Sequence, residues 1–457
     1  MPRLHVSRFA VAGLAFLAAT ASAATVDRTL SNGLKVIVKE DHRSPVVASQ
    51  VWYKAGSIDE FNGTTGVAHV LEHMMFKGTK KVGPGEFSKI IAEAGGRENA
   101  FTSSDYTTYF EQVEKSKLPL VFRLEADRMQ NLALSADEFA KEIKVVMEER
   151  RWRTEDKPQS LVYEQTVATA YQEHPYRRPV IGWMNDLQHM TVDDARDWYR
   201  RWYAPNNAVL VVVGDVKADE VFKLAQTYFG KLKPHALPLR KSQEEPQQVG
   251  TKRVTVKAPA KLPYLLMAYH TPVLRDVDKD WEPYALEVLA GVLDGNPAAR
   301  LNRSLVREQQ IANEVGAGYD AVSRGPALFV VEGTPSEGKT VGALEAAIRA
   351  ELERIKKDGV TAEELARVRS QVVAAKVYQR DSMFYQGMVI GQMELSGLSY
   401  KDIDTRLARL QQVTAEQVRD VARKYLTDDN LTVGTLDPQP LDTKKPAMPP
   451  KGLHHDF

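Results

Sequence analysis

Two histidines and a glutamate stand within five residues of one apolar stretch. Residues 66–78 read GVAHVLEHMMFKG and contain the pattern His69-x-x-Glu72-His73. On an α-helix, side chains four residues apart lie on one face, about one turn from each other. Two imidazoles placed in this way can bind one zinc ion. Glu72 lies beside the same face, where it can accept a proton from the water that the metal activates, so the spacing predicts a metal site with a general base.

The simpler interpretation of this stretch is a core helix whose two histidines are hydrogen-bonded. The chain has only 10 histidines, and by composition alone the pattern is expected in about one such chain in a hundred. Zinc held by two histidines usually takes a third protein ligand and keeps one position open for water. A third ligand elsewhere in the sequence therefore bears on the choice between the two interpretations.

A second predicted helix, residues 136–153, offers two acidic candidates. Glu142 and Glu149 are seven residues apart, which is two helical turns, so they lie on one side of this helix. One of them can bind the metal while the other orients a histidine. The alternative is a solvated acidic face paired with neighbouring basic residues, namely Lys141, Lys144 and Arg150.

The elements around these residues recur in two halves of the chain. The first half is predicted to hold a hairpin around Asn32-Gly33, strands at 44–56, 99–113 and 207–216, and helices at 66–78, 85–96, 118–131, 136–153 and 218–232. The second half is predicted to hold strands at 262–272, 327–335 and 430–438 and helices at 283–295, 342–359 and 361–381. The similar order predicts two domains of similar design.

We therefore predict an α+β fold of two structurally similar α/β-sandwich domains, each an antiparallel-rich sheet covered by helices. The N-terminal domain is predicted at residues 24–233 and the C-terminal domain at 258–437. Residues 234–257, rich in proline, glutamine and charge, are predicted to be a linker. Residues 438–457 are predicted to form a flexible tail.

The start of the chain has the pattern of a secretory signal peptide, which we place at residues 1–23. Two arginines precede an apolar run, and Ala21-Ser22-Ala23 has the small-x-small pattern of a cleavage site. A membrane anchor is the alternative, but the run is short for a bilayer span. We expect secretion across an inner membrane to the periplasm, with no membrane anchor after cleavage.

The overall composition excludes two further kinds of chemistry. The chain of 457 residues contains no cysteine, so disulfide bonds cannot support the fold in an oxidising compartment. Its 61 lysines and arginines nearly balance its 60 aspartates and glutamates. This balance gives no electrostatic reason to expect binding to nucleic acid.

Taken together, the motifs resemble those of the pitrilysin/insulinase family (M16) of zinc peptidases, whose His-x-x-Glu-His motif reverses the more common order. In that family a glutamate some 75 residues beyond the second histidine completes the site, with another glutamate seven residues before it. Glu149 lies 76 residues after His73 and has Glu142 before it, so Glu149 matches better than its neighbour Glu148. The family pattern around GGRENAFTSSDYTTY, residues 95–109, is also present.

The resemblance implies a zinc metalloendopeptidase with one Zn²⁺ per chain. It implies His69, His73 and Glu149 as ligands, Glu72 as the base and Glu142 as the residue that orients a histidine. It also implies that peptide substrates add to an edge strand, whose residues are Asn99, Ala100, Phe101 and Thr102. The alternative is a metal-binding but non-catalytic scaffolding or peptide-binding relative.

The resemblance further implies a dimer. Family members build a closed chamber from four such domains, so a chain with two resembles half of a clamshell, like the zinc-bearing subunit of bacterial periplasmic members and the processing-peptidase β subunit. The family's second half carries an arginine and a tyrosine seven residues apart. Here Arg307 is present, but Asn313 stands near the tyrosine position, and Tyr319 is twelve residues away. We expect a homologous metal-free subunit to supply the Arg/Tyr pair in a heterodimer; a homodimer is the alternative.

Overall fold

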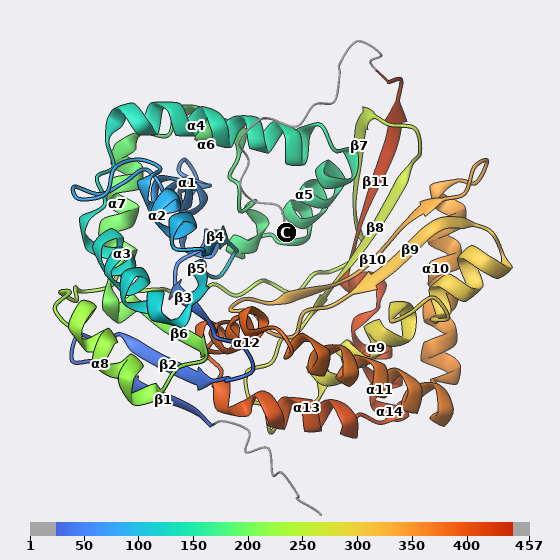
Figure 1. The fold of residues 1–457 in the computed structure, drawn as a ribbon. Coiled ribbons are helices and arrows are strands. Elements are labelled where there is room, and N and C mark those ends of the chain that lie inside the picture. Colours follow the sequence, from blue (N-terminus) through green and yellow to red (C-terminus); the bar gives the residue numbers. More distant parts are fainter. Residues whose placement is uncertain (1–23, 442–457) are drawn as a thin grey trace, which may run out of the picture.

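The computed structural model describes residues 24–441 and contains two β-sheets, each covered by helices (Figure 1). The predicted signal peptide (1–23) and most of the predicted tail (442–457) lie outside the described residues. Across the part that is described, no helix is both long enough and apolar enough to cross a lipid bilayer. We refer to residues 24–233 as the first half and to residues 258–437 as the second half.

The sheet of the first half has six strands in the order β1-β2-β6-β3-β5-β4. Strands β2 and β6 run parallel, and the other neighbours run antiparallel. The strands are β1 (Thr25–Thr29), β2 (Lys35–Glu40), β3 (Val46–Tyr53), β4 (Arg97–Thr102), β5 (Thr107–Glu114) and β6 (Ala208–Gly214). The predicted hairpin around Asn32-Gly33 is confirmed as the β1–β2 turn.

The sheet of the second half has five strands in the order β7-β11-β8-β10-β9. Here β7 and β11 run parallel, and the other neighbours run antiparallel. The strands are β7 (Lys252–Pro259), β8 (Tyr264–Thr271), β9 (Ala312–Gly318), β10 (Ala327–Pro335) and β11 (Leu431–Gln439). This order repeats β2-β6-β3-β5-β4, so the predicted antiparallel-rich sheets and the similarity of the two halves are confirmed.

Helices pack on both sheets and bury most of the apolar side chains. The helices of the first half are α1 (Val67–Met74), α2 (Glu86–Glu93), α3 (Leu118–Asn131), α4 (Ala136–Arg150), α5 (Pro158–Ala170), α6 (Met184–His189), α7 (Val192–Trp202) and α8 (Ala218–Tyr228). Those of the second half are α9 (Glu282–Asp294), α10 (Val341–Asp358), α11 (Ala362–Gln379), α12 (Met383–Ser396), α13 (Ile403–Gln412) and α14 (Ala415–Tyr425).

One helix from each half covers the sheet of the other half, an exchange that the sequence pattern does not predict. Helix α5 packs on β7, β8 and β11, where Val162 is buried against Leu266 and Leu436. Helix α12 packs on β3 and β6, where Ile390 is buried against Trp52. Because each exchanged helix completes an apolar core of the opposite half, the two halves are held together by buried surface as well as by the connecting chain.

The predicted single strand at residues 99–113 is wrong in one respect: it is a hairpin of β4 and β5. The Ser103 hydroxyl accepts hydrogen bonds from the amides of Asp105 and Tyr106, and the Ser103 amide donates to the Tyr106 carbonyl. Serine and aspartate favour such turns because their side chains bond to the nearby backbone. As a result β4 becomes the last strand of the sheet, next to β5.

Two predicted boundaries also shift. Strand β7 begins at Lys252, inside the range 234–257 predicted as linker, because it pairs in parallel with β11. Strand β11 continues through Gln439, so the first two residues of the predicted tail, 438–439, are paired with β7. Pairing with a distant strand decides both boundaries, although Val254, Thr255 and Val256 are residue types that are common in strands.

Candidate metal centre

The helix that carries the His-x-x-Glu-His pattern is α1, and all of its residues are buried. Its N-terminus is held by Glu60, whose carboxylate accepts hydrogen bonds from the amides of Gly66 (2.8 Å) and Ala68 (2.9 Å). These are two of the donors that the first turn of a helix leaves without a helical partner. Gly66 has φ = 87°, and a Cβ there would lie 2.6 Å from the Ile181 carbonyl oxygen. Sequence analysis did not identify Glu60.

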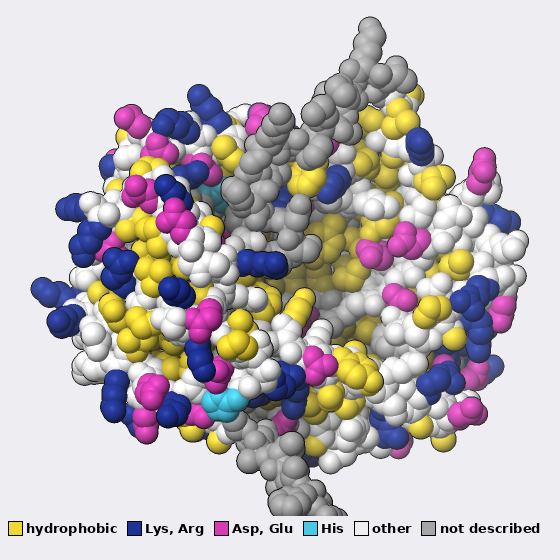
Figure 2. All heavy atoms as spheres, viewed as in Figure 1, with side chains coloured by type: hydrophobic (Ala, Val, Ile, Leu, Met, Phe, Trp, Pro, Cys, Tyr) yellow, Lys and Arg dark blue, Asp and Glu magenta, His cyan; other side chains and the backbone are white. Residues whose placement is uncertain are grey.

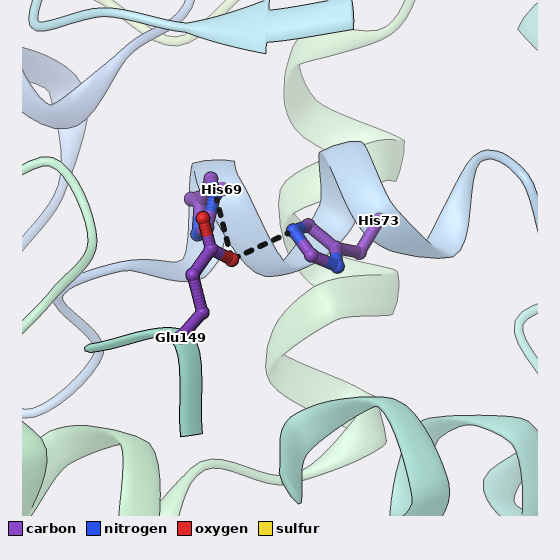
Figure 3. Close-up of side chains that lie close together, drawn as sticks. All are labelled: His69, His73 and Glu149. Atoms are coloured by element: carbon purple, nitrogen blue, oxygen red, sulfur yellow. Dashed lines mark ion pairs between the residues drawn. The ribbon is translucent and has the colours of Figure 1, made fainter. Parts of the chain in front are cut away.

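Helices α1 and α4 bring His69, His73 and Glu149 together, as Figure 3 shows. The Glu149 Oε2 atom lies 3.3 Å from His73 Nε2 and 3.8 Å from His69 Nε2. One potential ligand atom from each residue lies within 4.8 Å of the others, and all three side chains are buried. Two imidazoles and one carboxylate are ligands that suit a zinc ion with one position left open. The predicted set of three therefore converges.

The second glutamate of α4 contacts the other side of the His73 ring. Glu142 Oε1 lies 2.8 Å from His73 Nδ1, and Glu142 Oε2 lies 2.6 Å from the Lys77 ammonium. A hydrogen bond at Nδ1 fixes the ring orientation and leaves Nε2 directed toward Glu149. Glu142 thus has the contact expected of a residue that orients a metal-binding histidine.

The charges around His73 favour a cation at this position. Burial lowers the pKa of His73, but hydrogen bonds with Glu142 and Glu149 outweigh it and raise the pKa to about 9. Burial likewise raises the pKa of Glu149, but His73, His69 and Arg153 outweigh it and lower the pKa to about 2. Since a metal ion competes with the proton for the same histidine nitrogen, two carboxylates that favour the proton also favour a divalent cation.

Glu72 is almost completely buried beside the two histidines, with 1% of its surface exposed. Its Oε2 atom accepts a hydrogen bond from the Thr102 hydroxyl at 2.5 Å. Burial raises the pKa of Glu72 to about 7. A carboxylate whose pKa lies near neutrality is suited to accept and then return a proton. Sequence analysis assigned Thr102 to peptide binding and did not predict this bond to Glu72.

A cavity of about 230 Å³ opens beside these groups. Its lining includes His69 and Glu72 together with Ala100, Phe101 and Thr102 of β4. The remaining lining residues are Arg153, Thr154, Val180 and Ile181. Three of the four predicted substrate-binding residues therefore face the same space as the candidate base, whereas Asn99 is not among the lining residues.

Arg153 is a further site residue that sequence analysis missed. It lies in the π-helical residues Arg151–Glu155 that continue α4, and its Nε is 3.0 Å from Glu149 Oε1. Its spacing of four residues from Glu149 is a signal that could have identified it. The neighbouring Glu148 has a side chain that is 58% exposed and paired with Arg151, so it does not join the site.

The residues at or near the positions of the family's Arg/Tyr pair lie in the second half. Arg307 belongs to the π-helical turn η6 (Asn302–Glu308), and Asn313 is an exposed residue of β9. The Tyr319 hydroxyl donates to the Pro272 carbonyl oxygen at 2.6 Å, so this tyrosine is hydrogen-bonded within the second half of the chain.

Two family models match this chain. Residues 35–183 match the model described as insulinase (peptidase family M16), and residues 189–372 match the model described as the peptidase M16 inactive domain. The first match includes the whole candidate site. The second includes most of the sheet and several helices of the second half.

Individual relatives agree with these matches. The zinc protease PqqE of Helicobacter pylori is 34% identical over 422 residues, which is 90% of this chain and 92% of the relative. A protease from H. pylori has a crystal structure with a TM-score of 0.86 and 30% identity, covering 91% of this chain and all of that one. The periplasmic protease PqqL of Escherichia coli has a similar fold, with a TM-score of 0.77 and 20% identity, and this chain covers 48% of it. The chain belongs to the insulinase (M16) family of zinc proteases.

Proposed function

We propose that this chain is a zinc metalloendopeptidase that hydrolyses peptides enclosed in a chamber, and that it is the catalytic subunit of a dimer. The observation that carries the proposal is the buried convergence of His69, His73 and Glu149, with Glu72 beside them. A bound zinc ion supplies Lewis-acid polarisation of a peptide carbonyl and lowers the pKa of water.

The chain's own residues then have distinct roles. Glu72 accepts the proton of the attacking water and later returns it to the leaving amine. The Thr102 hydroxyl holds one Glu72 oxygen, which keeps the other oxygen directed toward the cavity. Glu142 fixes the His73 ring through its Nδ1 atom, so that ring orientation does not have to be established during catalysis.

Peptides are proposed to bind as an added strand next to β4, through Asn99, Ala100, Phe101 and Thr102. Support comes from the position of β4 as the last strand of its sheet and from the cavity that Ala100, Phe101 and Thr102 share with Glu72. Backbone hydrogen bonds along an added strand give affinity without strong sequence preference. This mode suits an endopeptidase with many substrates.

The dimer proposal rests on the length of this chain relative to PqqL and on the contacts of Tyr319 in the second half. This chain aligns with about half of the PqqL chain, and Figure 2 shows a hollow between the two halves of the molecule. A homologous metal-free subunit would close this hollow and supply the Arg/Tyr pair, because Tyr319 is bonded within its own half. A homodimer is the alternative. We also propose a periplasmic location, in line with the predicted signal peptide.

The substitution Glu72→Gln tests the proposed role of the base. We expect hydrolysis of a quenched fluorescent peptide to fall by about 10²–10⁴-fold, the usual contribution of general base catalysis, while bound zinc stays at one per chain. Glu148→Gln is the matched control, since Glu148 is exposed and paired with Arg151. Unchanged hydrolysis by the Glu72→Gln protein would refute the assignment.

The partner proposal needs a separate assay. Mass photometry and peptide hydrolysis would be measured for the chain alone and after mixing with a metal-free M16 chain that carries the Arg/Tyr pair. We expect little hydrolysis by the chain alone and a large increase on mixing. Full hydrolysis by the lone chain as a dimer would support the homodimer instead.

A further inference from the structure

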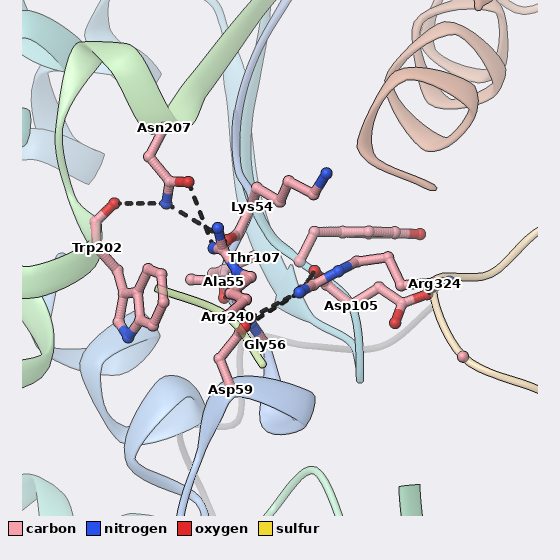
Figure 4. A network of polar contacts seen from close by, with 12 residues as sticks. Lys54, Ala55, Gly56, Asp59, Asp105, Thr107, Trp202, Asn207, Arg240 and Arg324 are labelled. Atoms are coloured by element: carbon pink, nitrogen blue, oxygen red, sulfur yellow. Dashed lines mark hydrogen bonds and ion pairs between the residues drawn. The ribbon is translucent and has the colours of Figure 1, made fainter. Parts of the chain in front are cut away.

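One arginine of the second half reaches deep into the first half (Figure 4). Arg324, in the loop between β9 and β10, contacts Asp59 through both ends of its guanidinium group: Nη1 lies 2.8 Å from Oδ2, and Nη2 lies 3.0 Å from Oδ1. The Asp59 side chain is only 4% exposed. Arg240, from the chain between the two sheets, adds a third contact at 2.8 Å. Two parallel N–H···O bonds between charged groups are strong and fix their mutual orientation.

Asp59 belongs to a short segment that also holds the N-terminus of α1. Glu60 follows it directly and accepts hydrogen bonds from Gly66 and Ala68. Ala68 immediately precedes His69, so the position of this segment sets where the first turn of α1 begins. The contact between Arg324 and Asp59 is therefore linked to α1 through Glu60, the next residue of the chain, and through the hydrogen bonds that Glu60 accepts.

The same arginine holds the turn between β4 and β5. Its Nη1 donates to the Asp105 carbonyl oxygen at 2.9 Å, and its backbone amide donates to Asp105 Oδ2 at 2.8 Å. The turn is in addition bonded to the Asp59 segment, because the Ile58 amide donates to the Ser104 carbonyl oxygen at 2.9 Å. Thr102, whose hydroxyl binds Glu72, is the last residue of β4 before this turn.

Tyr176 contacts both the turn between β4 and β5 and the loop that carries Arg324. Its hydroxyl donates to Asp105 Oδ1 and accepts a hydrogen bond from the Gly325 amide at 2.8 Å. Asp105 is buried, with 7% of its surface exposed. Both carboxylates that meet Arg324 thus lie inside the protein, where an unpaired charge would be costly.

We infer that Arg324 is a positioning residue for the metal centre. Through Asp59 it fixes the start of α1, and through Asp105 it fixes β4, so the helix of the candidate metal site and the proposed peptide-binding strand are aligned by one residue of the second half. The effect on hydrolysis rests on the proposed function, whereas the effect on the two segments does not. The second half therefore contributes to its own chain's active site as well as to the chamber wall.

Hydrogen exchange with mass spectrometry on the full chain tests the inference without using activity. In Arg324→Met we expect amide exchange to accelerate at least tenfold in peptides that cover residues 57–68 and 99–106. We also expect kcat/KM for peptide hydrolysis, measured in the active assembly, to fall by about 10–100-fold, because a displacement near 1 Å at a catalytic group has an effect of this size. The zinc dissociation constant is expected to rise in the same variant.

The matched control is Lys35→Met, which removes another ion pair between the halves. Lys35 on β2 lies 2.6 Å from Glu394 on α12, and within the described part of the chain this ion pair does not touch the Asp59 segment or the hairpin turn. It should leave exchange in both peptides unchanged. The inference is overturned if Arg324→Met exchanges like the wild type in these peptides, or if Lys35→Met accelerates them equally.

A second variant keeps the test decisive if Arg324→Met does not fold. Arg324→Lys keeps the charge but loses the two-pronged contact with Asp59. We expect faster exchange in the same two peptides and a smaller fall in kcat/KM. Wild-type exchange in this variant would show that the two-pronged contact does not position the segments. If neither wild type nor variants hydrolyse peptides, the proposed function fails, while the exchange result still decides the inference.

Discussion

The two halves contain the same pair of packed helices but bury different chemistry between them. In the first half α1 follows β3 and packs on α4; in the second half α9 follows β8 and packs on α11. The strands occupy equivalent places in their sheets. Between α1 and α4 lie two histidines and the carboxylates of Glu142 and Glu149. Between α9 and α11, a Cβ at Gly291 would lie 2.9 Å from methyl groups of Val368 and Val372, and the ion pair of Glu287 with Lys376 at 2.5 Å contains no histidine.

This difference shows that the same packing of two helices can serve two purposes. The backbone brings two helix surfaces together, and the side chains between them decide whether the contact is a candidate metal site or part of the core. An apolar contact such as that of Gly291 stabilises the fold through burial and dispersion. The buried ionisable groups of the first half bring a desolvation cost that apolar groups do not. Each of them is instead bonded to an opposite charge or directed at the candidate metal position.

Replacing one histidine between α1 and α4 should have the largest effect. It removes part of the chemistry that distinguishes this helix pair from α9 and α11. In His73→Leu we expect zinc to fall from one per chain to below a tenth, and hydrolysis to fall by at least about 10³-fold, because one ligand and the Glu142 contact are both lost. Elemental analysis and the peptide assay measure this. His189→Gln, at an exposed histidine, should change neither. Retention of stoichiometric zinc in His73→Leu would contradict the proposed ligand set.

Removing the charge that orients the ring should have an intermediate effect. In Glu142→Gln we expect the zinc dissociation constant to rise by about 10–100-fold, as is usual when the partner of a metal-binding histidine is changed. Competition with a fluorescent chelator measures it. Glu138→Gln, one turn earlier on α4, is the control and should bind zinc normally. An unchanged constant in Glu142→Gln would show that Lys77 and the ring packing suffice.

A change in the second half should alter stability and leave the metal alone. Gly291→Leu forces a side chain between α9 and α11, and we expect a loss of about 1–3 kcal/mol in the free energy of unfolding, the usual cost of overpacking a core. Urea unfolding of the apo protein measures it. The zinc dissociation constant should stay at the wild-type value. A weakened zinc site with unchanged stability would contradict the separation of the two helix pairs.

The smallest predicted effect lies where the halves meet, at His174. A Cβ at Gly325 of the second half would lie 2.3 Å from the His174 ring. Burial lowers the pKa of His174 to about 4, with Glu245 opposing and Arg178 and Arg275 adding to the shift. Since the unfolded chain takes up this proton near pH 6.5, the folded state is favoured above that pH and loses stability as the pH falls from 6.5 toward 4.

Comparison with His174→Gln isolates this contribution. Between pH 7.5 and 5.5 we expect the wild-type free energy of unfolding to fall by about 1 kcal/mol more than that of the variant, from the linkage of a pKa of about 4 in the folded state to 6.5 in the unfolded state. Urea unfolding at the two pH values measures the difference. Equal falls would show that His174 is protonated as readily in the folded protein as in the unfolded chain.

Much of the site follows from the sequence because its geometry is local. The four-residue spacing of His69 and His73 and the seven-residue spacing of Glu142 and Glu149 each define one helix face by periodicity alone. The repeated order of elements also predicts two similar sheets. By contrast, the hairpin within residues 99–113 was missed because strand-forming residues continue on both sides of its turn, although Ser103 and Asp105 are residue types that favour turns.

The sequence by itself determined the ligand types, their helical spacing and the two-half plan, because these depend on composition and on periodicities within one element. Only the tertiary structure decided that α5 and α12 exchange halves and that Arg324 reaches Asp59 across 265 residues of chain. The physical reason is that such contacts depend on how distant segments pack together. No local pattern of residues records which distant partner a buried arginine or an apolar helix face will meet.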